Sequence, residues 1–175
     1  KYGFTPSMFT DTYIRNLNNE HRYYIHNLEI PDNVVIIGAS AFSSCKELES
    51  VKIPSSVESI GTAAFASCVR LEGITVDENN KYYSSDEYGV LFNKNKTKLI
   101  QYPIGNMREK YTIPDSVKEI GNGAFKECDS LESITLPFVG NKVDDTSNAY
   151  LGYIFGASSY REQKNFVPDS LTSVI

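Results

Sequence analysis

No stretch of the sequence reaches the roughly 18 consecutive apolar residues that a membrane-spanning helix requires, so we expect no membrane insertion. Basic residues are not in excess, because 17 lysines and arginines face 22 aspartates and glutamates and leave a net charge of -5. Proteins that follow nucleic-acid phosphates normally carry a clustered basic surface, so this balance argues against a nucleic-acid partner. The start of the chain also lacks the basic and apolar segments of a secretion signal.

Histidine is scarce as well. The chain contains only His21 and His26, both near its N-terminal end and ahead of the first cysteine, Cys45. Nucleophilic catalysis by serine or cysteine needs an imidazole held next to the nucleophile. We therefore expect no catalytic residues and no enzymatic activity.

The sequence does contain a 23-residue phrase that is repeated. The frame I-P-x-x-V-x-x-I-G-x-x-A-F-x-x-C-x-x-L-x-x-[VI]-x begins at Ile30, Ile53 and Ile113. A period of this length is typical of a solenoid, in which each repeat buries its apolar face against its neighbours. Solenoids end in a polar capping unit, which the end of this sequence lacks, so we expect the chain to be part of a longer protein.

Each repeat contains one short strand. Val51 and Ile53 flank Lys52, the alternation of a strand with one buried face. Stacked in register, the equivalent segments predict a parallel sheet whose strands end at a proline, which cannot donate to a ladder. These segments are residues 25–30, 48–53, 71–76, 108–113 and 131–136.

An Ala-Phe pair follows the glycine of each frame. It lies in a small-residue stretch that we expect to form one helical turn. Phe42, Phe65 and Phe125 should stack there as a column, each stabilising the fold by about 1.5 to 3 kcal/mol when fully buried.

The three cysteines share one position of the frame. Cys45, Cys68 and Cys128 lack the closely spaced pairs of a zinc site, and buried thiols packed as small apolar groups suit this position better. Only Cys45 and Cys68 could pair between adjacent repeats, and that alternative stays open. The acidic segments 77–80 and 144–145 lack the spacing of a calcium loop and predict solvated turns. We therefore expect no metal and no cofactor.

The period breaks twice. Residues 90–102 contain two apolar runs around a turn rich in asparagine and lysine, which predicts a hairpin inside an insert of about residues 77–107. A second insert covers about residues 138–167, after which we expect a new strand at 171–174. The resulting division is an N-terminal flank at residues 1–24 and a repeat domain at residues 25–175.

The phrase L-x-x-[VI]-x-I-P-x-x-V-x-x-I-G-x-x-A-F-x-x-C resembles the BspA-type leucine-rich repeat of bacterial and some protist surface proteins, over roughly residues 25–175. Segments 88–100 and 151–160 are similar to parts of such proteins from gut bacteria. The resemblance implies a right-handed leucine-rich-repeat solenoid of β-rich α/β type, with about six repeats and a concave parallel sheet. It also implies a non-enzymatic surface or secreted module. Arg108 and Lys110 depart from the pattern, so we expect a distorted fourth strand.

The concave sheet is one candidate binding surface, because repeat proteins commonly bind there. Its outward positions are small and polar, and a column of carboxylates runs beside them. Like charges stacked across a sheet repel, so either a cationic partner or water alone offsets the repulsion. The column consists of Glu49, Glu72, Glu109 and Glu132, preceded by His26.

Tyrosines offer the other candidate surface. The chain has 12 tyrosines and no tryptophan, and many of the tyrosines lie outside the repeat frame. Tyrosine is common at protein interfaces, although these residues could equally cover small cores within the inserts. We expect the candidates to be Tyr150, Tyr153 and Tyr160.

The resemblance, taken with these candidate surfaces, implies an extracellular adhesion or interaction module at the cell surface. Its partner would be a protein, for instance one from a host or another cell, or a glycan. The alternatives are a structural spacer and an accessory glycan-binding domain of a larger secreted enzyme. A spacer should expose no large apolar patch, whereas a glycan binder should align aromatic rings on one open face.

Overall fold

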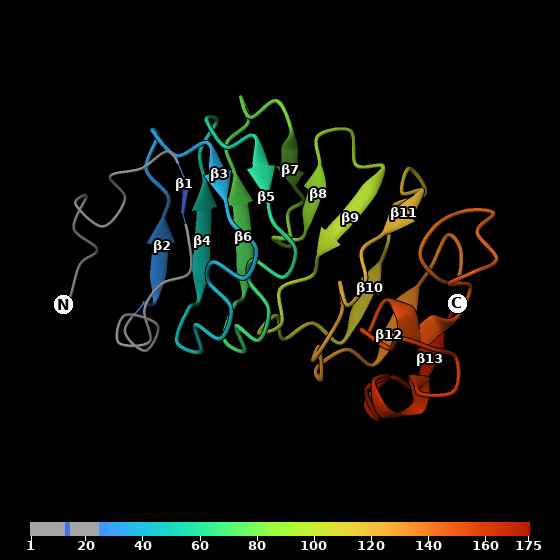
Figure 1. Cartoon of the computed structure of the whole chain (residues 1–175). Coiled ribbons are helices and arrows are strands. Elements are labelled where there is room, and N and C mark those ends of the chain that lie inside the picture. Colours follow the sequence, from blue (N-terminus) through green and yellow to red (C-terminus); the bar gives the residue numbers. More distant parts are fainter. Residues whose placement is uncertain (1–12, 15–24) are drawn as a thin grey trace.

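The structure is a computed structural model that describes residues 13–14 and 25–175, in which short strands stack rung upon rung into a solenoid (Figure 1). Helix is nearly absent from the described residues, which contain only the two 3-10 helices η3 (Leu151–Tyr153) and η4 (Gln163–Asn165). The predicted repeat solenoid is therefore confirmed. Most of the predicted N-terminal flank, including His21, lies outside the described residues.

The predicted parallel strands form, but in two separate sheets. The first sheet has the order β2 (Asn27–Glu29), β4 (Ser50–Ile53), β6 (Gly73–Val76), and the second has the order β10 (Lys110–Thr112), β12 (Ser133–Thr135), β13 (Ser173–Val174). Burial alternates along β4 as the pattern around Lys52 predicts. Ser173 pairs with Ser133, which confirms that the frame resumes as a strand near the C-terminal end.

The first insert occupies the edge of β6. The amide of Ile74 donates to the carbonyl of Gly89 at 3.0 Å, so the insert takes the place of the fourth repeat strand. Gly89 has a φ of 74°, and a Cβ there would lie 2.5 Å from the Cα of Gly73, so this crossing requires glycine. The expectation of one continuous sheet is therefore wrong. The expected distortion of the Arg108–Ile113 strand is also wrong, because β10 pairs in regular register with β12.

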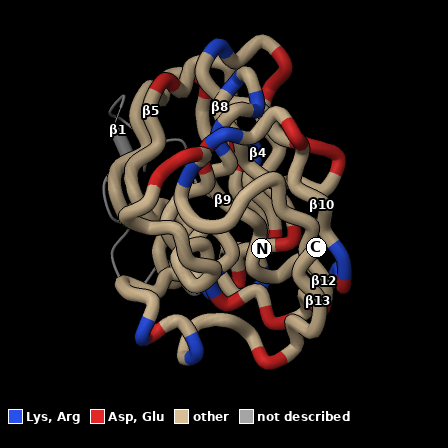
Figure 2. Tube along the Cα trace, turned by 90° about the vertical axis from the view of Figure 1, so that its right-hand side faces the viewer, with Lys and Arg blue, Asp and Glu red and all other residues tan. Residues whose placement is uncertain are grey.

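A second row of strands runs along another side of the solenoid, nearer the viewer than the first row in Figure 1 and on the left in Figure 2. In the first half it consists of β1 (Tyr13–Ile14), β3 (Ile36–Ile37) and β5 (Ser59–Ile60), all parallel. In the second half, β11 (Glu119–Ile120) pairs with the insert, whose strands are β7 (Tyr83–Ser85), β8 (Leu91–Asn93) and β9 (Lys98–Gln101). The antiparallel pair β8 and β9 is the predicted hairpin, and β7 adds a strand that the sequence pattern did not predict.

The small-residue stretches form consecutive turns and not the expected helical turn. Ala63 has a φ of 56°, and Ser40, one repeat earlier, has a φ of 55°. A residue in the left-handed region cannot continue a right-handed helix, which explains the difference. Phe42 and Phe65 still stack in the core, with ring centroids 5.6 Å apart and planes 4° apart.

The predicted phenylalanine column continues with other aromatic residues in the second half. Tyr102 stacks on Phe125 at 5.1 Å, and Phe155 follows at 6.2 Å from Phe125. Buried apolar residues accordingly form two clusters, one in each half of the solenoid. Strand β8 lies between them, since Leu91 belongs to the first cluster and Phe92 to the second.

Candidate functional site

A groove opens where the first insert separates the two halves of the solenoid. It has a volume of about 680 Å³ and runs between the turn at residues 60–67 and the turn at residues 121–126. Leu91, Ile100 and Ile104 contribute apolar lining, and alanines and glycines of the two turns contribute much of the rest. We call this site the insert groove.

Tyr83 bounds the insert groove beside β5. Its hydroxyl accepts a hydrogen bond from the amide of Ile60 at 2.9 Å, which caps part of the exposed edge of β5. Tyr82, next to it, is 46% exposed and also lines the groove. Aromatic, aliphatic and backbone groups therefore meet at this site.

Charges at the insert groove are largely balanced. Lys98 Nζ lies 2.5 Å from Glu119 Oε1, and Lys126 Nζ lies 3.5 Å from Glu127 Oε1. Basic and acidic residues are also interspersed over the side of the molecule in Figure 2. The groove therefore has no strong preference for a ligand of one charge.

The carboxylate column is divided between the two halves. The backbone amide of Glu72 donates to the carbonyl of Glu49, and that of Glu132 donates to the carbonyl of Glu109. Beyond Glu72 the insert follows, and the Asn106 side chain donates to the carbonyl of Glu72. Glu49 Oε1 lies 3.5 Å from His26 Nδ1 and forms an ion pair with Arg70 Nη2 at 2.7 Å. Arg70 also forms an ion pair with Glu47, so a cation of the chain itself offsets the repulsion at this end of the column.

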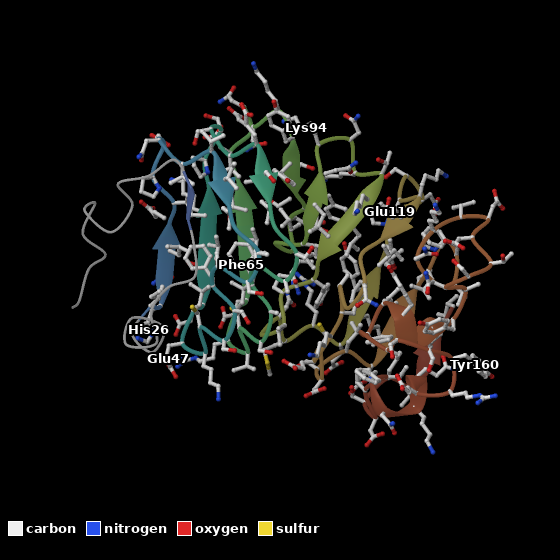
Figure 3. All side chains as sticks on the ribbon, viewed as in Figure 1. His26, Glu47, Phe65, Lys94, Glu119 and Tyr160 are labelled. Atoms are coloured by element: carbon white, nitrogen blue, oxygen red, sulfur yellow. The ribbon has the colours of Figure 1, made fainter. Side chains whose placement is uncertain are left out.

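The three tyrosines of the second insert differ in exposure. Tyr150 is buried, and its hydroxyl donates to the carbonyl of Ala157 at 3.2 Å. Tyr153 is half-buried and packs edge-on against Tyr150, with ring centroids 6.2 Å apart, and burial raises its pKa. Tyr160 is 70% exposed and projects at the opposite end of the molecule from His26 (Figure 3). Only Tyr160 of the three is a fully accessible side chain.

The cysteines lie in the core as the repeat frame predicts. All three are buried thiols, and Cys68 Sγ donates to the carbonyl of Phe42 at 3.1 Å. Burial raises the pKa of the Cys128 thiol well above its usual value. Within the described part of the chain, no three histidine, cysteine or acidic side chains gather as a metal site would require.

The acidic segments form turns. The Asp77 carboxylate accepts the amide of Asn79 at 2.8 Å, whereas the buried side chain of Asn80 donates to the carbonyls of Pro54 and Val57. Asn80 is therefore an anchor of the insert and not part of a solvated turn. Asp145 accepts hydrogen bonds from Ser147 and Asn141, and these lower its pKa from 3.8 to about 2.

Sequence reasoning missed the insert groove. One signal was available: Tyr102 lies one repeat length before Phe125, at the position of the core phenylalanine, and is buried although it belongs to the insert. The insert therefore supplies a partial rung, and the groove lies between this rung and the preceding turn. The described residues include no helix with the length and apolar character needed to cross a bilayer.

The family model described as BspA type leucine rich repeat region matches residues 12–107 and 105–147, with six copies. A crystal structure of a leucine-rich repeat protein from Eubacterium ventriosum is 34% identical, with a TM-score of 0.60, and the match covers 63% of this chain and 29% of that one.

The crystal structure of the pneumococcal vaccine antigen PcpA is also similar, with 28% identity and a TM-score of 0.55. The match covers 65% of this chain and 34% of that one. The chain thus corresponds to about a third of the length of these two proteins. No curated protein matches the chain.

Proposed function

Because the chain belongs to the BspA-type leucine-rich repeat family, we propose that it is a non-catalytic protein-interaction module of a surface-associated bacterial protein. The observation that carries this proposal is the insert groove. Its volume of about 680 Å³ and its mixed apolar and backbone lining are typical of a binding site. Adhesion to a host protein or to another cell is the role that would follow.

The likeness to a pneumococcal vaccine antigen supports a location at the cell surface or outside the cell. Antibodies raised against the domain should bind intact, unpermeabilised cells of the source bacterium. Binding that occurs only after the cells are opened would contradict a surface location.

Two alternatives fit the structure less well. A structural spacer does not require a groove. It also does not require exposed apolar side chains such as Val69 and Met107, which line a second hollow beside Ile104. A glycan platform needs aromatic rings aligned on one face, whereas Tyr150 and Tyr153 are at 83° to each other and one of them is buried. A protein partner is therefore favoured over a glycan.

We propose that a protein partner seated in the insert groove, which Gly156 of the second insert also lines, makes further contacts with Tyr160 and Tyr153 outside the groove, with Tyr150 supporting Tyr153 from within. The carboxylates Glu49, Glu72, Glu109 and Glu132 are the competing surface. Ions screen exposed charges, so a partner bound through the carboxylates would dissociate as the salt concentration rises.

The test is a binding survey of the purified domain against extracellular proteins and glycans. With any confirmed partner, Tyr153→Ala combined with Tyr160→Ala should weaken binding at least tenfold, about 1.4 kcal/mol. Glu72→Gln combined with Glu109→Gln should leave affinity nearly unchanged. The reverse result would move the site to the sheet, and the absence of any protein partner would refute the proposed function.

A further inference from the structure

We propose that the insert groove binds an extended segment of a partner protein, whose backbone hydrogen-bonds to the groove as an added rung of the solenoid. This inference rests on the proposed protein-interaction role and adds to it a site and a class of ligand. It follows from a row of backbone amides that the chain leaves open at the groove.

The first two rungs show how turns of this solenoid hydrogen-bond to each other. Alternate amides of one turn donate to alternate carbonyls of the next. The bonds run from Ser40 to Thr62 at 3.0 Å, from Phe42 to Ala64 at 2.8 Å and from Ser44 to Ala66 at 2.8 Å. Each turn therefore presents donors on one side and acceptors on the other.

The next donors in this ladder have no acceptor among the described residues. One repeat after the three donors come Ala63, Phe65 and Ser67, and all three line the insert groove. The two turns have the same backbone conformation, since φ is 55° at Ser67 and 63° at Ser44, and 56° at Ala63 and 55° at Ser40. Their amides therefore point in the same direction. None of the three amides donates to another described residue.

The facing wall offers acceptors. Asn122 and Lys126 are the equivalents of Thr62 and Ala66 in the turn at residues 121–126, and both line the groove. Neither of their carbonyls accepts a backbone amide from the described residues, whereas Ala124 between them accepts the amide of Tyr102 at 2.8 Å. At the level of the turns, the insert therefore hydrogen-bonds to the second half through Tyr102 and leaves the turn amides at 63, 65 and 67 of the first half open to a ligand.

An extended peptide satisfies such an edge, because its carbonyls and amides alternate along the strand. The small side chains of Ala63 and Ala66 on the first wall leave room for a backbone to approach closely. Ile100 and Ile104 provide apolar contacts for a side chain, and the paired lysines favour no charge. The expected ligand is therefore an extended, uncharged segment with small and aliphatic side chains.

The probe for the experiment is a phage-displayed library of random linear peptides, selected on the purified domain. Ala66→Arg should fill the groove, and Ser43→Arg places the same side chain at the equivalent half-buried position one repeat earlier. Selected peptides should bind the wild type and Ser43→Arg alike and bind Ala66→Arg at least about tenfold more weakly.

Amide hydrogen exchange followed by NMR provides a readout that needs no variant. In the unliganded protein, Ala63, Phe65 and Ser67 should exchange at least about tenfold faster than Ser40, Phe42 and Ser44. A bound peptide should slow exchange at the first three amides. Replacing one peptide amide by an ester weakens its carbonyl as an acceptor, and this change should lower affinity.

Several results would overturn the inference. Peptides that bind Ala66→Arg as well as the wild type, or that leave the three amides unprotected, would exclude the groove. A dimer of the domain that Ala66→Arg dissociates would make a second copy of the chain the occupant. If folded proteins bind and no linear peptide does, the inference fails while the proposed function stands; if neither class binds, the proposed function fails.

Discussion

Phe65 lies at the centre of the first core cluster. It is 2% exposed and stacks on Phe42, so removing its ring leaves a cavity that the neighbouring rungs cannot fill. Phe65→Ala should lower the free energy of unfolding by about 3 to 5 kcal/mol, measured by urea denaturation. Tyr160→Ala, at an exposed tyrosine, is the control. An effect of Phe65→Ala no larger than that of the control would show that the ring is not part of the core.

Asp145 gives the protein a specific dependence on acid. The pKa of Asp145 is about 2 in the folded protein, below its usual value of 3.8. The ionised carboxylate therefore contributes its full stabilisation above pH 3.8, and this contribution is lost as the pH falls through about 2. Asp145→Asn should therefore destabilise the protein at neutral pH, and the difference from wild type should shrink across that interval. Urea unfolding of both proteins at a series of pH values measures it. A difference that does not change with pH would contradict this assignment.

At the residue scale, the sequence predicts burial better than exposure. The positions of Phe42, Phe65 and the three cysteines follow from the repeat frame, because every copy places them on the same interior side. Tyr150 and Tyr160 have no such frame. One is buried and the other exposed because of how the second insert folds on itself, which composition alone does not encode.

The hydroxyl of Tyr83 links the first insert to β5. Tyr83→Phe removes the acceptor of the Ile60 amide and should cost about 1 kcal/mol of unfolding free energy. The Ile60 amide should also exchange faster in this variant. Tyr82→Phe, at the exposed neighbour, is the matched control and should have little effect. Equal stability of the two variants would show that the cap contributes nothing.

Strands were predictable at the element scale where burial alternates, as in β4 and β12. The break in the sheet was not, because it depends on Gly89 crossing Gly73 rather than on the sequence of either strand. The sequence predicts helical turns where the structure has left-handed residues. Ala63 and Ser67 adopt a positive φ although neither is glycine, so no residue type in the sequence indicates this conformation.

At the scale of the whole molecule, the candidate site is a gap in the ladder of backbone hydrogen bonds between adjacent rungs. Sequence patterns identify residues that pair, and the insert groove consists of amides that do not. The difference lies in the hydrogen bonds between rungs: the amide of Phe42 donates to the carbonyl of Ala64, whereas the amide of Phe65 has no acceptor among the described residues. This explains why fold class was predictable while the site was not.

Because of this gap, the two halves of the solenoid should unfold as two separate units. Solenoid stability is approximately the sum of repeat stabilities and contacts between neighbouring rungs, and here the ladder between rungs is interrupted between two separate core clusters. Native-state amide exchange at increasing urea concentrations should show two opening units, one reported by Val51 and the other by Ile134. Phe65→Ala should lower protection mainly at Val51.

Phe125→Ala is the matched variant in the second cluster, and it should lower protection mainly at Ile134. The two halves still touch, since the amide of Gly105 donates to Leu71 at 2.8 Å, so each variant should have a smaller effect on the other half. Equal loss of protection at both reporters in both variants would mean that the solenoid opens as one unit. In that case the insert would transmit stability across the groove, through Leu91 and Phe92 on β8, rather than separate the two halves.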